Sequence, residues 1–174
     1  MAVDIATVRL AGRWWRQLPA GLDPVRRPDP PRDARWQRGE VVDAVYLADS
    51  PETAWAEWYR WLAESGLPPR AGLPRDLWRV EVELDGVADL RSAGALAAID
   101  LGAPRAARCE YRPSREWVSA SIARAGRRWS RRARRAQTGV VLCVFWPAPE
   151  DALVDHRSHE RVTEAPEVPR GLRT

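Results

Sequence analysis

Residues 41–64 constrain the fold most, because they predict a buried strand that leads directly into a capped helix. The segment VVDAVYLA, residues 41–48, is largely apolar on both alternating faces, which is typical of a strand covered on both sides. Ser50 has the features of a helix cap, and it precedes a proline and an acid in the first turn. The predicted helix extends to about Glu64, before a glycine and two prolines. Tyr46 on the strand therefore points to one definite face.

The predicted helix carries an acidic residue at the edge of its apolar stripe. The stripe is expected to consist of Ala54, Trp58, Trp61 and Leu62. Glu57 lies roughly 80° from the centre of that stripe by the 3.6-residue period. An edge position can border a cleft, and the alternative interpretation of Glu57 is a solvated ion pair with Arg60.

The remaining elements favour an α+β fold. Residues 77–84 alternate like a half-exposed strand, and the chain is expected to turn at Asp85-Gly86. Helices are predicted at 93–101 and 114–126, and a buried strand at 139–146. This irregular order favours a mixed or antiparallel β core flanked by helices over a doubly wound sheet. The chain has no glycine-rich dinucleotide fingerprint and no P-loop.

The length of 174 residues is that of one ordinary domain. We expect this domain to cover residues 1–155 and the polar segment 156–174 to be a mobile tail. No run of about eighteen apolar residues and no signal-peptide pattern occurs, so we expect a soluble, cytoplasmic protein without a membrane segment. Cys109 and Cys143 are expected to be reduced core residues.

The net charge of +4 and the pI of about 9.8 favour an anionic partner or ligand. Seven arginines lie within residues 124–135, a run that fits a nucleic-acid contact, a pyrophosphate contact or a solvated face. All 28 basic residues are arginine, which suggests coding bias, so the number of arginines says little about function. A non-catalytic nucleic-acid-binding module therefore stays open as an interpretation.

The sequence predicts no metal site and no serine-protease-like triad. His156 and His159 lie in the expected tail, without a cysteine or histidine partner at a metal-binding spacing. No Gly-x-Ser-x-Gly elbow occurs.

Arg35, Tyr46 and Glu57 are equally spaced along the chain. An arginine that follows a proline-rich loop can donate two hydrogen bonds to a phosphate, and a tyrosine ring can stack on a heterocycle. A carboxylate can stabilise positive charge that develops on a ribose. Each residue also has a structural alternative, since Arg35 could cover Trp36 and Tyr46 could be a core residue. Together the three favour a site that holds and breaks a dinucleotide.

These motifs resemble the RES domain family of NAD-degrading toxins, which is named for an arginine, a glutamate and a serine. The resemblance rests on Arg-Trp followed by a glycine at 35–39, on the strand with Tyr46 and on the helix SPETAWAEW with Glu57. The segment RRWSRRARR is similar to the family's serine segment, which makes Ser130 the serine.

Upstream, Arg16 and the Leu-Asp-Pro at 22–24 are similar to the family's first arginine and its Asp-Pro step. The likeness covers roughly residues 9–155. The sequence departs from the family at Gln37, where asparagine is common, and in the insert-like region 62–76. These departures concern the substrate details more than the fold.

The resemblance implies an α+β fold similar to ADP-ribosyltransferases, with NAD+ bound as a substrate and no metal. Glu57 would stabilise the oxocarbenium-like state as the nicotinamide–ribose bond breaks. Arg35 and Arg16 would hold the pyrophosphate, and Tyr46 would pack on the nicotinamide or its ribose. Ser130 would hydrogen-bond the nicotinamide side or orient Glu57.

The resemblance further implies an NAD+ glycohydrolase or phosphorylase that depletes cellular NAD+. A cognate antitoxin of the helix-turn-helix type would block the active site, so nucleic acid would be contacted only through the antitoxin. A protein ADP-ribosyltransferase that uses the same site is the alternative function. The sequence leaves the acceptor open: water, phosphate or a protein side chain.

Overall fold

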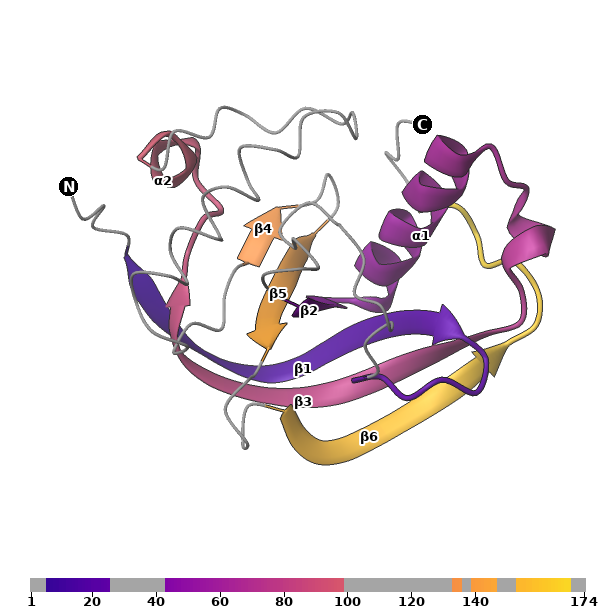
Figure 1. Ribbon diagram of the computed structural model, residues 1–174, viewed down its shortest axis with the longest axis horizontal. Coiled ribbons are helices and arrows are strands. Elements are labelled where there is room, and N and C mark those ends of the chain that lie inside the picture. Colours follow the sequence, from indigo (N-terminus) through magenta and orange to yellow (C-terminus); the bar gives the residue numbers. More distant parts are fainter. Residues whose placement is uncertain (1–5, 26–42, 99–132, 136–138, 147–152, 170–174) are drawn as a thin grey trace.

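An antiparallel sheet organises the computed structural model, which describes residues 6–25, 43–98, 133–135, 139–146 and 153–169. The sheet has six strands in the order β4-β5-β2-β1-β3-β6 within these residues (Figure 1). The strands are β1 (Thr7–Pro19), β2 (Asp43–Ala48), β3 (Arg75–Ala88), β4 (Ala133–Arg135), β5 (Val140–Trp146) and β6 (Leu153–Val162). The helices are α1 (Pro51–Ser65), the 3₁₀ helix η1 (Pro69–Gly72) and α2 (Ala93–Ala97). The expected α+β fold with an antiparallel core is confirmed.

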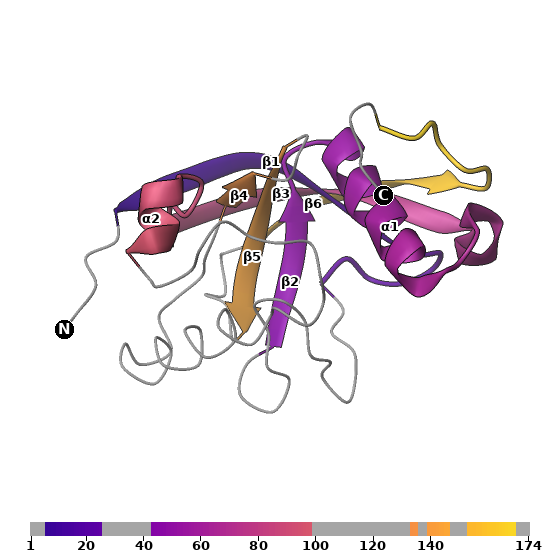
Figure 2. The ribbon, with the colours of Figure 1, turned by 90° about the horizontal axis from the view of Figure 1, so that it is seen from above.

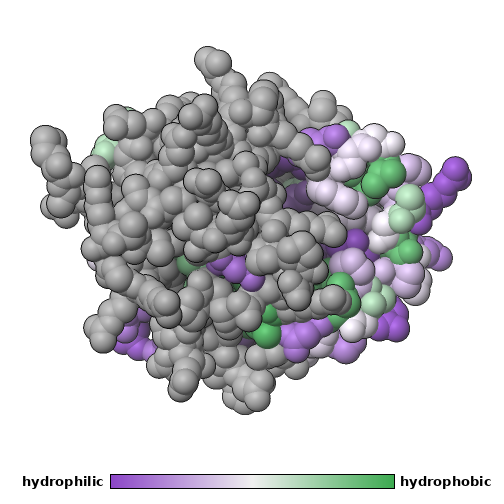
Figure 3. Space-filling model, in the orientation of Figure 1, coloured by the Kyte–Doolittle hydropathy of each residue, from purple (hydrophilic) through white to green (hydrophobic). Residues whose placement is uncertain are grey.

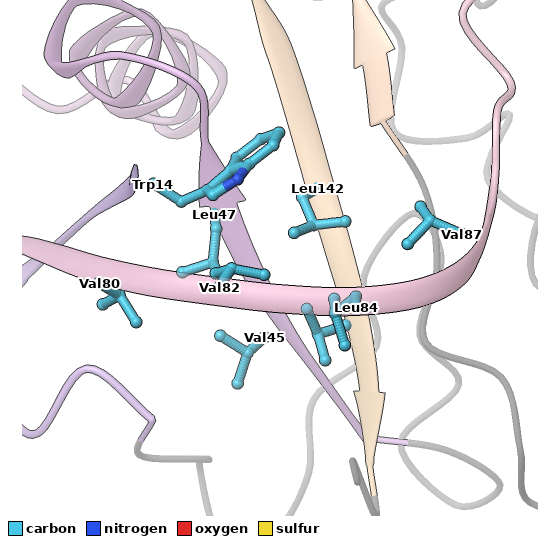
Figure 4. Close-up of a cluster of buried hydrophobic side chains, with 9 residues drawn as sticks. Trp14, Val45, Leu47, Val80, Val82, Leu84, Val87 and Leu142 are labelled. Carbon is cyan, nitrogen blue, oxygen red and sulfur yellow. The ribbon is translucent and has the colours of Figure 1, made fainter. Parts of the chain in front are cut away.

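The sheet folds over between β1 and β2, which are in register only at Trp15 and Ala48. Strands β2 and β5 therefore cross β1 and β3 instead of continuing alongside them (Figure 2). Buried side chains from both halves meet in the main core (Figure 4). They are Trp14, Val45, Leu47, Val80, Val82, Leu84, Val87, Leu142 and Val144. This bend lets one sheet supply both walls of a hydrophobic core.

Helix α1 begins and ends where the sequence predicts. The Ser50 side chain accepts a hydrogen bond from the Thr53 N–H, at 3.1 Å, and Pro51 stands in the first turn. Gly66 ends the helix with a φ of 65°, a left-handed conformation that glycine adopts without strain. The strand before it and the later strand β5 also match their predictions, and α2 confirms a short helix near residue 93.

The apolar face of α1 differs from the prediction at Trp61, whose exposure is 44%. The buried cluster instead contains Trp55, Trp58, Tyr59 and Leu62. It packs against Leu73, Leu77 and Val162. These neighbours follow the helix in sequence, and their position turns the buried face away from Trp61.

The predicted turn at Asp85-Gly86 is wrong, because β3 continues through both residues to Ala88. Val87 is paired with Val8 and Leu84 with Leu10, so two residues of β3 stand opposite one residue of β1. Gly86 has a φ of 66°, as in a β-bulge that begins with glycine. Asp-Gly often forms a tight turn, but here Asp85-Gly86 forms a bulge that accommodates one extra residue within the long strand β3.

The expected tail is also wrong for residues 156–162, which belong to strand β6 and pair with β3. Beyond the strand, the Tyr59 hydroxyl donates a hydrogen bond to the Pro166 carbonyl. The polar composition of β6 misled the prediction, because β6 is an edge strand and needs few apolar residues.

Asp76 anchors β6 to the sheet. Its carboxylate is 1% exposed and accepts two hydrogen bonds from the Arg161 guanidinium, at 2.9 and 3.1 Å. It also accepts one from the Gly21 N–H, at 2.7 Å. The bonds from Arg161 and Gly21 lower the pKa of Asp76 from its usual value to about 2, against the opposing effect of burial.

This low pKa predicts an acid-dependent loss of stability. The Asp76 carboxylate stabilises the fold above its unfolded pKa of about 4, and this contribution should disappear as the pH falls from about 4 toward 2. Urea unfolding of wild type and Asp76→Asn should therefore differ most near pH 6, with the difference shrinking below pH 4. A difference that is independent of pH would contradict the prediction.

Among the described residues, no helix is both long enough and apolar enough to cross a membrane. Cys143 is buried and takes part in no disulfide within the described part of the chain. Cys109 and the predicted helix at 114–126 lie outside the described residues.

Candidate active site around Tyr46 and Glu57

Tyr46 lies on β2 opposite Cys143 of β5. It is half-buried and packs against a second apolar cluster, on the face of β2 and β5 that points away from the main core. That cluster contains Ala44, Ala88, Leu90, Leu96, Cys143 and Phe145. The tyrosine is therefore partly a core residue, as its structural alternative predicts, yet part of its surface is accessible.

Helix α1, which carries Glu57, lies on the same face of the sheet as Tyr46. The pairing register gives this face, because residues paired across antiparallel strands point to the same side. Trp15 is paired with Ala48, and Ala48 is two residues from Tyr46 on β2, so all three share one face. Leu77, which packs against α1, is opposite Gln17, and Gln17 shares its face with Trp15. The β1–β2 pairing thus brings Tyr46 and α1 to one side of the sheet.

Glu57 forms the ion pair that its structural alternative predicts. The Arg60 Nη1 atom lies 2.9 Å from the Glu57 Oε1 atom, and the side chains are 22% and 39% exposed respectively. The pair is therefore only partly solvated, since the arginine is mostly covered. Glu57 remains accessible from solvent, as a carboxylate that meets a substrate must be.

Arg16 lies on the opposite face of β1. It is paired with Trp78 of β3, whose side chain packs against the main core, so Arg16 also points to the main-core side. Its guanidinium donates to the Pro24 carbonyl. Burial lowers the pKa of Arg16 to about 10, an effect opposed by the nearby carboxylates of Asp43 and Asp23. The structure thus places Arg16 beside the loop that follows β1 and does not join it to the face of Tyr46.

Arg35 and Ser130, the other two predicted site residues, lie outside the described residues. Of the arginine run at 124–135, only residues 133–135 are described, and they form the edge strand β4 paired with β5. The nucleic-acid, pyrophosphate and solvated-face interpretations of this run all stay open.

A junction that the sequence did not predict fixes the start of α1. The Val140 N–H donates to the Asp49 carboxylate at 2.7 Å, and the Asp49 N–H donates to the Val140 carbonyl at 3.0 Å. A Cβ atom on Gly139 would lie 1.9 Å from the Thr53 Oγ1 atom and 2.5 Å from the Asp49 Oδ1 atom. The only sequence signal was a glycine directly before a buried strand, and glycine is common wherever a chain turns into a strand.

Gly139→Ala is therefore expected to lower the free energy of unfolding by about 2–3 kcal/mol, since Thr53 is completely buried and cannot move away. Gly94→Ala is a matched control, because the nearest atom to its Cβ would be 4.0 Å away. Urea titrations of both variants measure the effect. Equal stability of the two variants would show that the junction can relax.

The described residues contain no group of three or more histidine, cysteine, aspartate or glutamate side chains that could hold a metal ion. The described surface in Figure 3 is mostly hydrophilic or neutral, with apolar residues in small separate areas. An accessible carboxylate on a helix, with an aromatic ring on the same face of the sheet, can stabilise a cation that forms next to a stacked heterocycle.

A family model described as the RES domain matches residues 7–165. Among solved structures, the chain resembles one described as the crystal structure of the M. tuberculosis MbcT-MbcA toxin-antitoxin complex, with a TM-score of 0.75 and 20% sequence identity. The match covers 90% of this chain and 87% of the other. No curated protein matches the sequence.

Proposed function

The chain belongs to the RES domain family, and on this premise we propose that it cleaves the nicotinamide–ribose bond of NAD+. The observation that carries the proposal is the common face of Tyr46 and of helix α1 with its accessible Glu57. Both residues belong to the segments that resemble the family's pattern, and the β1–β2 pairing brings Tyr46 and the helix of Glu57 to one side of the sheet.

In the proposed reaction, the bond between the ribose C1′ and the nicotinamide nitrogen breaks with both electrons going to the nitrogen. Nicotinamide leaves as a neutral molecule, so no proton donor is needed. The ribose becomes oxocarbenium-like, and the negative charge of Glu57 stabilises it. Water then adds to C1′ and loses a proton in a glycohydrolase, whereas phosphate adds in a phosphorylase.

The remaining roles follow from the chemistry of the side chains. Tyr46 would pack on the nicotinamide or its ribose. Arg35 would hold the pyrophosphate. Arg16, which donates to the Pro24 carbonyl on the other face of β1, takes no part in this arrangement. Ser130 would bind the nicotinamide side or orient Glu57. NAD+ is the substrate, and no metal takes part in the proposed mechanism.

We further propose that the protein is a cytoplasmic toxin that depletes NAD+, and that an antitoxin protein neutralises it. The description of the similar structure as a toxin-antitoxin complex supports this role. The antitoxin would be of the helix-turn-helix type and would block the active site, so that any nucleic-acid contact is made through it.

The test is incubation of the purified protein with NAD+ and separation of the products by chromatography. Free nicotinamide is expected, together with ADP-ribose in buffer without phosphate or a phosphorylated ADP-ribose when phosphate is the acceptor. Release that occurs only with an added protein acceptor would instead indicate an ADP-ribosyltransferase. No release with water, phosphate or candidate proteins would refute the proposal.

A further inference from the structure

The ion pair between Glu57 and Arg60 has a feature that an ordinary surface pair lacks. Pairs three residues apart on a solvated helix contribute little to stability, and their side chains move between rotamers. Here the Arg60 side chain is only 22% exposed, so surrounding atoms restrict it. The covered guanidinium lies 2.9 Å from one oxygen of a carboxylate that is itself more exposed.

Among the described residues, the ion pair with Arg60 is the polar side-chain contact that can orient Glu57. Its side chain has three rotatable bonds, and a half-exposed glutamate without a fixed partner would sample several rotamers. A carboxylate that stabilises a developing cation must be held to within about 0.5 Å of its working position. When one oxygen is held in the ion pair with Arg60, the second oxygen points in a defined direction.

We propose that Arg60 is a positioning residue that holds the Glu57 carboxylate in its working orientation, an inference that rests on the proposed function. In this role Arg60 acts through the orientation of the Glu57 carboxylate. Its positive charge by itself works against a nearby cation, so a purely electrostatic role would predict faster cleavage after its removal. A direct contact between Arg60 and a substrate phosphate would instead strengthen substrate binding, so its loss would mainly raise KM. The three roles therefore differ in their effects on kcat and KM.

The variants Arg60→Gln and Arg60→Lys distinguish these roles. Loss of positioning should lower kcat for nicotinamide release by about 10- to 100-fold in Arg60→Gln, with KM changed less than about threefold. Arg60→Lys should recover part of kcat, because an ammonium can still form an ion pair with Oε1 of Glu57. Arg9→Gln is the matched control, since it removes an exposed ion pair with Glu83 on another part of the sheet.

A second measurement tests the inference without turnover. In a Glu57→Gln background, Arg60→Gln should change the Kd for NAD+, measured by calorimetry, less than about twofold, because a positioning residue acts only through Glu57. Thermal unfolding shows whether each variant is folded, and Arg60→Lys keeps the test decisive if Arg60→Gln is destabilised.

Several outcomes would overturn the inference: unchanged or increased kcat in Arg60→Gln, a raised KM with normal kcat, a weaker Kd in the Glu57→Gln background, or no recovery by lysine. Each of these requires an active wild-type protein. A wild-type protein that releases no nicotinamide would instead refute the proposed function, so the two failures are distinguishable.

Discussion

Glu57→Gln is expected to lower the rate of nicotinamide release by on the order of 10²- to 10³-fold while leaving the protein folded. Glutamine keeps the size of the side chain but removes the negative charge that would stabilise the oxocarbenium-like ribose. The side chain is 39% exposed, so the substitution creates no cavity in the core. Chromatography of nicotinamide at saturating NAD+ measures the effect on kcat.

The matched control is Glu52→Gln, which makes the same chemical change in the first turn of the same helix. Glu52 is exposed and interacts mainly with the helix dipole, so nicotinamide release should stay within about twofold of wild type. Full activity of Glu57→Gln would exclude Glu57 from the reaction. A similar loss in both variants would show that the charge of the helix start matters, rather than one carboxylate.

Trp58→Ala is expected to cost about 3–5 kcal/mol of folding free energy. The indole is 1% exposed and packs edge-on against Trp55, with ring centroids 5.4 Å apart. It also lies 5.0 Å from the Tyr59 ring and under the Arg75 guanidinium, which is 5.6 Å from its centroid. The free energy of unfolding of such domains is about 5–15 kcal/mol, so this loss would be a large share of the total stability.

Urea unfolding followed by tryptophan fluorescence and by circular dichroism measures this loss. Trp61→Ala is the control, because Trp61 belongs to the same helix but is 44% exposed, and its loss should cost less than about 0.5 kcal/mol. If Trp58→Ala proved as stable as Trp61→Ala, the packing of α1 against Leu73, Leu77 and Val162 would not hold the helix on the sheet.

Local signals predicted the elements that depend on neighbouring residues. The Ser50 cap, the glycine end of α1 and the alternation of 43–48 act within a few residues of chain. The sequence could therefore place Tyr46 on a strand and Glu57 on a helix. The Asp85-Gly86 bulge failed as a prediction because turn and bulge use the same backbone conformation, and only the partner strand β1 decides between them.

Strand β6 shows the other source of error. Its pairing with β3 depends on residues about 80 positions apart, and Asp76 and Arg161 meet only when the sheet has formed. The same holds for the Asp49–Val140 junction and for the exposure of Trp61. None of these contacts has a local signature, because each side chain finds its partner through the fold.

The sequence alone determined the strand and helix that carry Tyr46 and Glu57, since period, capping and chain ends are local properties. Only the tertiary structure decided which face of the sheet these residues share and which side chains they contact. The fold-over between β1 and β2 put α1 on the face of Tyr46 and Arg16 on the other, and the mostly covered Arg60 side chain lies in an ion pair with Glu57. Faces and partners arise only when distant strands pair, because each pairing register sets the direction of every side chain along both strands.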